Sequence, residues 1–220
     1  MKAQLERLKA LRGSAAVPPG RLQELKAFQS ARLKATYADV AAQQRYRSAT
    51  QFFLEDLYGP KDFSRRDAEM MRILPSMARM LPASAVETAT LAVELEALSE
   101  ELDHRAARAM PPGPLDEARY GEAYRAGSTR PERERQIALI VAVGERLDTL
   151  VTRPLVYRTL KLMRGPAHLA GLDDLQDFLE RGFGAFKDMG GAREFLTLVR
   201  DRETAILERL FSGAPGPFSI

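Results

Sequence analysis

Cysteine is absent from the 220 residues of this chain. A chain without cysteine has no disulfide framework, no thiolate nucleophile and no cysteine-based metal site. The same absence suits a reducing compartment, and we expect a cytoplasmic protein. Histidine is nearly absent as well, because only His104 and His168 occur. Two histidines leave little material for a serine-type catalytic triad, and no zinc-protease spacing is present.

Long apolar runs are also missing. The most continuous one, residues 137–143, is far shorter than the roughly 20 residues that a helix needs to cross a bilayer. The first turns of the chain are too charged for a secretory signal, since they carry Lys2, Glu6, Arg7, Lys9 and Arg12. We therefore expect no membrane span.

Sequence motifs for phosphate or acyl chemistry are missing too. The chain has no Walker-type phosphate loop, no Gly-x-Gly-x-x-Gly unit between a strand and a helix, and no Gly-x-Ser-x-Gly elbow. We predict no cofactor, no metal and no catalytic residue. Acid–base chemistry by Glu, Asp, Tyr or Arg side chains that meet only in three dimensions stays open.

The overall composition indicates a folded protein whose charge is unevenly distributed along the chain. Hydrophobic residues make up 45% and charged residues 29%, which is ordinary for a globular chain. The net charge is +3, but residues 1–47 hold ten basic and three acidic side chains. A basic segment of this kind binds nucleic acid in some proteins, here through Lys26, Arg32, Lys34, Arg45 and Arg47. The alternative is a solvated helix face, which is favoured because no groove-reading motif accompanies the charges.

Apolar residues recur at helical spacing along the chain, with Gly and Pro between the segments. We predict an all-α fold, a single orthogonal or antiparallel bundle of about eight helices. Residues 1–20 are expected to form an amphipathic helix and a Pro/Gly linker, residues 21–212 the helical domain, and residues 213–220 an irregular tail. Residues 21–58 contain no Gly or Pro and are expected to be one helical segment.

Another long uninterrupted helical segment runs from Ser84 to Met110 and ends at a Pro-Pro-Gly-Pro run. At 100° per residue it has two apolar stripes on nearly opposite sides, one around Leu98 and Leu102 and the other around Val93 and Ala97. A helix that is apolar on two sides packs between neighbours. We therefore expect this helix near the middle of the fold.

Polar residues of this central helix have two interpretations. In the first, Glu94, Glu101 and His104 line an internal pocket, with His168 as a further candidate. In the second, the glutamates pair with arginines of adjacent helices, since a partly buried carboxylate needs a donor. The second is favoured, because the Glu-x-x-His spacing of bundle metal sites occurs only once, at Glu101 and His104.

A dense cluster of aromatic and charged residues spans positions 52–67, around a Gly-Pro helix stop. One interpretation is a docking surface with aromatic anchors and polar partners. The other is a well-connected corner between two helices, closed by capping and charge-assisted hydrogen bonds, and it is the favoured one. The candidate residues are Phe52, Phe53, Tyr58, Asp62, Phe63, Arg66 and Asp67.

This FFLEDLYGPKDF segment resembles one found in a family of uncharacterised bacterial all-helical proteins of about this length. Residues 165–172 (GPAHLAGL) and 178–183 (FLERGF) are similar to that family as well. The resemblance implies a helical fold and no particular activity.

Three hypotheses for function follow. The leading one is a non-enzymatic interaction or regulatory protein, with a protein partner or self-association. Its support is the missing chemistry, the aromatic cluster, and an N-terminal helix with Leu5, Leu8 and Leu11. The alternative is a helical ligand or cofactor pocket beside the central helix, with or without catalysis. Nucleic-acid binding through the basic segment is the weakest of the three.

Overall fold

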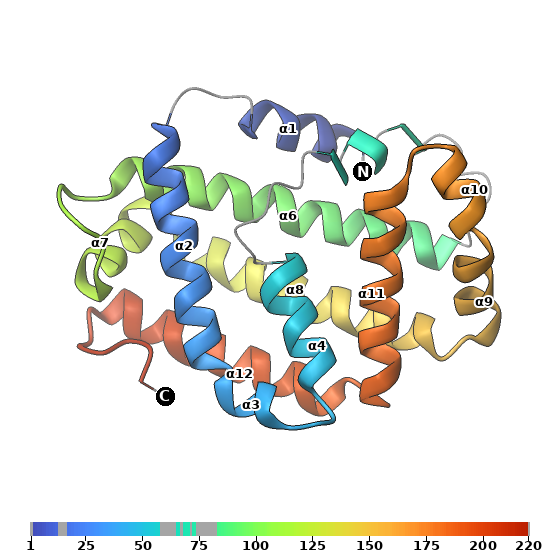
Figure 1. Ribbon diagram of the computed structural model, residues 1–220. Coiled ribbons are helices and arrows are strands. Elements are labelled where there is room, and N and C mark those ends of the chain that lie inside the picture. The colour runs from blue at the N-terminus through green and yellow to red at the C-terminus, as the bar shows by residue number, and fades with distance from the viewer. Residues whose placement is uncertain are drawn as a thin grey trace.

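The computed structural model describes residues 2–12, 17–57, 65–66, 68–70, 72–73 and 83–219. These residues form twelve helices and no β-strand (Figure 1), so the predicted all-α fold is confirmed. The helices are α1 (Lys2–Arg12), α2 (Pro19–Thr36), α3 (Ala38–Ala42), α4 (Arg47–Phe52), the π-helix η1 (Phe53–Leu57), α6 (Ala83–Ala109), α7 (Glu117–Gly127), α8 (Arg130–Val151), α9 (Pro154–Leu162), α10 (Arg164–Leu169), α11 (Asp173–Met189) and α12 (Arg193–Ser212).

Two sets of helices cross each other. Figure 1 shows α6, α8 and α12 running side by side across the molecule, with α2, α4 and α11 crossing them. Helix α8 contacts both α6 and α12, and α11 contacts α4 and α8. Helices α9 and α10 lie at one end, where they contact α11. The crossing places aromatic side chains of α4 and α11 in one shared interior.

The interior holds two groups of buried side chains. The larger lies between α2 to η1 on one side and α8, α11 and α12 on the other, and includes Tyr37, Phe53, Phe186 and Phe195. The smaller lies where α2, α6, α7 and α12 meet, and includes Leu25. Removing such apolar surface from water is the main contribution to the stability of a fold like this.

Helix α6 is the predicted central helix, and its neighbours are α1, α2, α7 and α8. Val93 and Ala97 are buried on one side and Leu102 and Ala106 on the other, as the two apolar stripes require. Helix α1 packs along α6 with Leu5 buried. The sandwiched position of the central helix is thereby confirmed.

Helix ends follow from local chemistry. Helix α8 begins with a capping box, in which Thr129 and Glu132 satisfy each other's backbone N–H groups. Helices α11 and α12 end at Gly190 (φ 64°) and Gly213 (φ 71°), where the left-handed conformation suits glycine.

Two segment boundaries differ from the sequence prediction. Residues 21–58 were expected as one helical segment, but the described part of it breaks after Thr36 and again at Gln43, which is extended (ψ 123°). The break at Tyr37 accompanies its complete burial, with the phenol donating to Glu203 at 3.0 Å. A Gly-Pro pair usually closes a helix, but Gly165 and Pro166 lie in the first turn of α10, where proline loses no helical hydrogen bond.

Candidate functional site

The described residues of the aromatic cluster face the interior. Phe52 and Phe53 are buried. Phe52 packs on Phe178, with ring centroids 5.3 Å apart, and Phe53 meets Tyr37 edge-on. In this fold the two phenylalanines contact the chain itself and are not exposed to a partner.

Arg66 is buried as well. Its guanidinium donates to Glu96 at 2.5 Å and lies 4.7 Å from the centre of the Phe178 ring. It therefore connects the segment before α6 to both α6 and α11. The other candidates in this cluster, Tyr58, Asp62, Phe63 and Asp67, lie outside the described residues.

The two glutamates proposed for a pocket on α6 pair with arginines of neighbouring helices. Glu94 accepts a hydrogen bond from Arg135 of α8 at 2.7 Å, and Glu101 accepts one from Arg7 of α1. Neither carboxylate faces His104, whose near neighbour is Glu100, one turn before it, with His104 Nε2 3.3 Å from Glu100 Oε1.

A polar group not predicted from the sequence surrounds Glu100. Lys26 of α2 donates to both carboxylate oxygens of Glu100, at 3.0 and 2.9 Å. Asp103, one turn further along α6, accepts from Gln29 at 2.9 Å, and burial raises the pKa of its carboxyl. In the sequence, the signal for this group is the i, i+4 spacing of Glu100 and His104.

His168 lies apart from the α6 candidates, on α10, which packs on α9 and α11. Its ring is exposed, and Nδ1 lies 2.7 Å from Asp173 Oδ1. This hydrogen bond is the main reason why the pKa of Asp173 is lowered. The structure therefore does not bring His168 together with His104, Glu94 or Glu101.

Much of the basic charge of the N-terminal segment is neutralised by ion pairs with other helices of the chain. Arg32 donates to Glu203 of α12 at 2.7 Å, and Arg45 donates to Glu194 of the same helix at 2.7 Å. Lys26 pairs with Glu100, as described above. Only Lys34 and Arg47 of the five predicted nucleic-acid contacts are exposed without such a partner among the described residues.

Helix α9 is the feature of the described surface that packing does not explain. Five of its nine residues are apolar, yet none of the nine is buried. Leu155 and Leu162 expose 75% and 77% of their surface, and Leu169 of α10 exposes 89%. Leu155 and Leu162 are seven residues apart, so they project from the same side of the helix. Contiguous groups of exposed apolar side chains mark interaction sites in folded proteins, whereas single exposed ones do not.

Positive charge accompanies these leucines. No Asp or Glu occurs between Asp148 and Asp173, whereas Arg153, Arg158, Lys161 and Arg164 do. Arg164 pairs with Glu180, which holds the pKa of that carboxyl below its usual range. The other three cations make no ion pair within the described part of the chain. We define the α9–α10 surface as the exposed side chains Arg153, Leu155, Arg158, Lys161, Leu162, Met163 and Leu169.

The α9–α10 surface rests on a fixed support. On the inner side of α9, Val156, Tyr157 and Leu160 pack against the larger core. Gln176 of α11 donates to the Leu160 carbonyl at 2.7 Å and to Glu180 at 2.8 Å. The leucines of the surface therefore project from helices that are already packed, which lowers the entropy lost on binding.

Sequence reasoning missed this surface, although part of its signal was visible. The gap in acidic residues between Asp148 and Asp173 can be read from the sequence. The exposure of Leu155 and Leu162 cannot be read from the sequence, because these residues have the spacing of core leucines in other helices. Only the three-dimensional position of α9 at the end of the bundle (Figure 1) separates the two cases.

Within the described ranges, no helix is long and apolar enough to cross a bilayer. The same residues contain no group of three His, Asp or Glu side chains placed to hold a metal ion. The chain belongs to a family defined by a domain of unknown function, DUF8198, whose model matches residues 12–217. No curated protein and no solved structure matches the chain.

Proposed function

We propose that this protein is a non-enzymatic interaction protein that docks on an anionic lipid surface through the α9–α10 surface. The observation that carries the proposal is the exposure of Leu155, Leu162 and Leu169 beside three exposed cations, Arg153, Arg158 and Lys161, that make no ion pair among the described residues. The protein lies on such a surface and does not cross it.

Apolar insertion supplies the first part of the attraction. Transferring a leucine side chain from water into an apolar medium contributes about 1.5–3 kcal/mol. Three exposed leucines on two adjoining helices therefore offer a useful but reversible anchor. Their aliphatic side chains project outward, which suits entry at the boundary between headgroups and acyl chains.

Charge supplies the second part. A Lys or Arg near an anionic membrane contributes about 1 kcal/mol at ordinary ionic strength. Arg153, Arg158 and Lys161 are exposed next to the leucines, and none of them makes an ion pair with a carboxylate that the structure describes. Weak apolar anchors become effective when a basic patch adds to them, and this surface has both.

A second copy of the chain fits this surface less well. In a twofold dimer the same patch meets itself, so the exposed cations Arg153, Arg158 and Lys161 would face their own copies, which repel them. A protein partner would need acidic side chains and a shape that receives projecting leucines. A lipid surface needs no matching shape, and we therefore favour it.

Co-sedimentation with vesicles tests the proposal. We expect the full-length protein to bind phosphatidylcholine vesicles that contain phosphatidylserine, and to bind pure phosphatidylcholine vesicles at least about fivefold less. Raising the salt concentration should weaken the binding, because exposed charges are screened. Leu162→Gln keeps every charge and should reduce binding to the anionic vesicles by roughly tenfold.

Matched variants separate the surface from general charge. Arg158→Gln should weaken binding, while Lys34→Gln, which removes one exposed cation from α2, should leave it unchanged. Light scattering of the same samples tests the second-copy alternative. A dimer that Leu162→Gln abolishes would overturn the lipid proposal, and so would folded protein that binds neither kind of vesicle. The second result would favour an acidic protein as the occupant.

The compartment is part of the proposal. The cysteine-free composition suits a reducing environment, and the cytoplasmic leaflet is the anionic one. We therefore assign the protein to the cytoplasmic face of a membrane. The resemblance of its aromatic segment to a bacterial family implies that this membrane is bacterial.

A further inference from the structure

Two lysines meet at one tyrosine ring, at the end of the bundle where α9, α10 and α11 lie together (Figure 1). Lys161 of α9 places its Nζ 4.8 Å from the centre of the Tyr157 ring, and Lys187 of α11 places its Nζ 4.4 Å from the same centre. Both ammonium groups therefore border one ring, although they come from different helices.

Neither ammonium group makes an ion pair with a carboxylate that the structure describes. Glu180 of α11 does not serve them, because its two carboxylate oxygens already accept hydrogen bonds from Arg164 and Gln176. Asp188 follows directly after the lysine of α11, and consecutive residues of a helix do not face each other. The positive charge of the two lysines is thus left for a counter-charge from outside the described fold.

Tyr157 supplies a third donor beside the two lysines. Its ring is half-buried and packs against the larger core, which fixes its position. Its hydroxyl makes no hydrogen bond with any described residue. A phenol can donate one hydrogen bond and an ammonium group three, so the three side chains together present donors alone to an anion.

Charge lies on only one flank of the exposed leucines of α9. At about 100° per residue, Arg158 lies next to these leucines, followed by Lys161 and then by Tyr157 on the side of α11. The opposite flank carries the uncharged side chains Thr159 and Met163. A diffuse attraction to a charged surface needs no such asymmetry. Cations gathered on one flank favour a single anionic group bound there.

We propose that this flank binds the phosphomonoester headgroup of a lipid of the phosphatidic acid type, an inference that rests on the proposed docking on a lipid surface. Lys161, Lys187 and the Tyr157 hydroxyl donate to the phosphate oxygens while the leucines enter the bilayer. A phosphomonoester carries about −1.5 to −2 charges at neutral pH, which matches two ammonium groups. Phosphatidylserine carries a single net negative charge, and its own ammonium group would be repelled by the two lysines.

Co-sedimentation with two charge-matched kinds of vesicle tests the headgroup. Both contain phosphatidylcholine, and one adds phosphatidic acid while the other adds phosphatidylserine, at contents that give the same zeta potential. We expect the full-length protein to bind the phosphatidic acid vesicles roughly fivefold more tightly, which is the effect of one further charge contact near a membrane. Because the surface potentials are equal, the difference reports the headgroup itself.

Variants identify the groups. Lys187→Gln lies outside the α9–α10 surface, so it should abolish the preference for phosphatidic acid and weaken binding to phosphatidylserine by less than about twofold. Tyr157→Phe keeps the ring and removes the hydroxyl, so it should reduce the preference without abolishing it. Lys34→Gln, which removes an exposed cation from α2, should leave the preference unchanged. Circular dichroism melts check that each variant is folded.

Equal binding to the two charge-matched vesicles would overturn the headgroup assignment and leave docking on a lipid surface intact. A preference that persists in Lys187→Gln would also overturn it, because the phosphate would then be bound elsewhere. Binding to neither kind of vesicle would remove the lipid proposal itself. Glycerol 3-phosphate, a soluble phosphomonoester, tests the source of the phosphate. It should not bind measurably, because it lacks the acyl chains, and saturable binding without vesicles would assign the site to a free phosphate ester instead.

Discussion

Arginine side chains join helices that are distant in the sequence. Arg181 of α11 holds Asp56 of η1 with two hydrogen bonds, at 3.2 and 3.0 Å. Arg105 of α6 holds Glu132 in the first turn of α8 at 2.7 Å. An arginine fork fixes direction as well as distance, so each pair sets how two helices meet.

Glu132 gives a prediction at the residue scale. Burial acts to raise the pKa of its carboxyl, but hydrogen bonds from Thr129 and Arg105 outweigh this and lower the pKa to about 2. A carboxyl whose folded pKa is depressed stabilises the fold above its unfolded pKa, near 4.5, and loses that contribution as the pH falls toward 2. Glu132→Ala should therefore lower the free energy of unfolding by roughly 1–2 kcal/mol at neutral pH and by much less near pH 2.

Urea unfolding at several pH values measures this difference. Glu134→Ala, at an exposed position of the same helix, is the control and should differ little from wild type at any pH. A cost for Glu132→Ala that stays constant from neutral pH down to about pH 2 would contradict the ionic origin of the cap.

At the scale of elements, close approach between helices depends on small residues. A Cβ atom at Gly127, the last residue of α7, would lie 2.5 Å from the backbone nitrogen of Ala106 and 2.6 Å from its Cα. A Cβ at Gly182 would lie 2.8 Å from the tip of the Phe52 ring. The distance between α6 and α7 at this point is therefore set by a contact between backbone atoms. A backbone atom cannot move aside as a side chain does when it changes rotamer.

Gly127→Ala should separate α6 from α7. We expect a loss of roughly 2–3 kcal/mol from overpacking, and a melting temperature lower by roughly 5–10 °C. Gly184→Ala is the matched control, because a Cβ there meets nothing within 4 Å. That change should stabilise the interior of α11 by up to about 1 kcal/mol. Equal melting temperatures for the two variants would show that α6 and α7 have room to move apart.

At the scale of the whole molecule, α1 packs against the helices that follow it in the chain. Leu5 and Leu8 are almost fully buried, and α1 contacts α6. The sequence-based boundary at residue 20 stays a prediction, and unfolding cooperativity tests it. If α1 unfolds together with the other helices, a substitution at Leu8 changes the free energy of the single unfolding transition.

Leu8→Ala should lower the free energy of unfolding by about 2–4 kcal/mol while leaving one transition and an unchanged m-value. Lys9→Ala, at the exposed neighbouring position, should change it by less than about 0.5 kcal/mol. Guanidinium unfolding followed by circular dichroism measures both variants. A main transition unaffected by Leu8→Ala would show that α1 unfolds separately.

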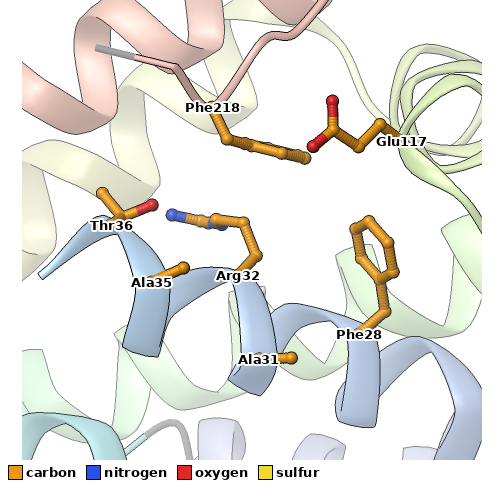
Figure 2. A pocket seen from close by; sticks show the side chains of 7 residues that line it. All are labelled: Phe28, Ala31, Arg32, Ala35, Thr36, Glu117 and Phe218. Carbon is orange, nitrogen blue, oxygen red and sulfur yellow. The ribbon is translucent and has the colours of Figure 1, made fainter. Parts of the chain in front are cut away.

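Periodicity was enough to predict the all-α fold and the position of α6, because both follow from where apolar side chains recur along one helix. The break after Thr36 was not predictable, because it accompanies a hydrogen bond from Tyr37 to Glu203 in α12, which is distant in the sequence. The packing of the tail was not predictable for a related reason: Phe218 belongs to the predicted irregular tail, yet its ring packs on Phe28 in α2 (Figure 2). Contacts between residues so far apart leave no local pattern.

The hydrogen bonds from α12 to α2 and α3 have a consequence for synthesis on the ribosome. Arg32 and Glu203 are 171 residues apart, and Arg202 returns to Asp39 and to the Thr36 carbonyl. While the ribosome is still translating the middle of the chain, these early side chains have no counterpart to bind. The nascent bundle therefore stays open along one flank until α12 emerges, and during that interval chaperones have access to the core side chains that α12 later covers.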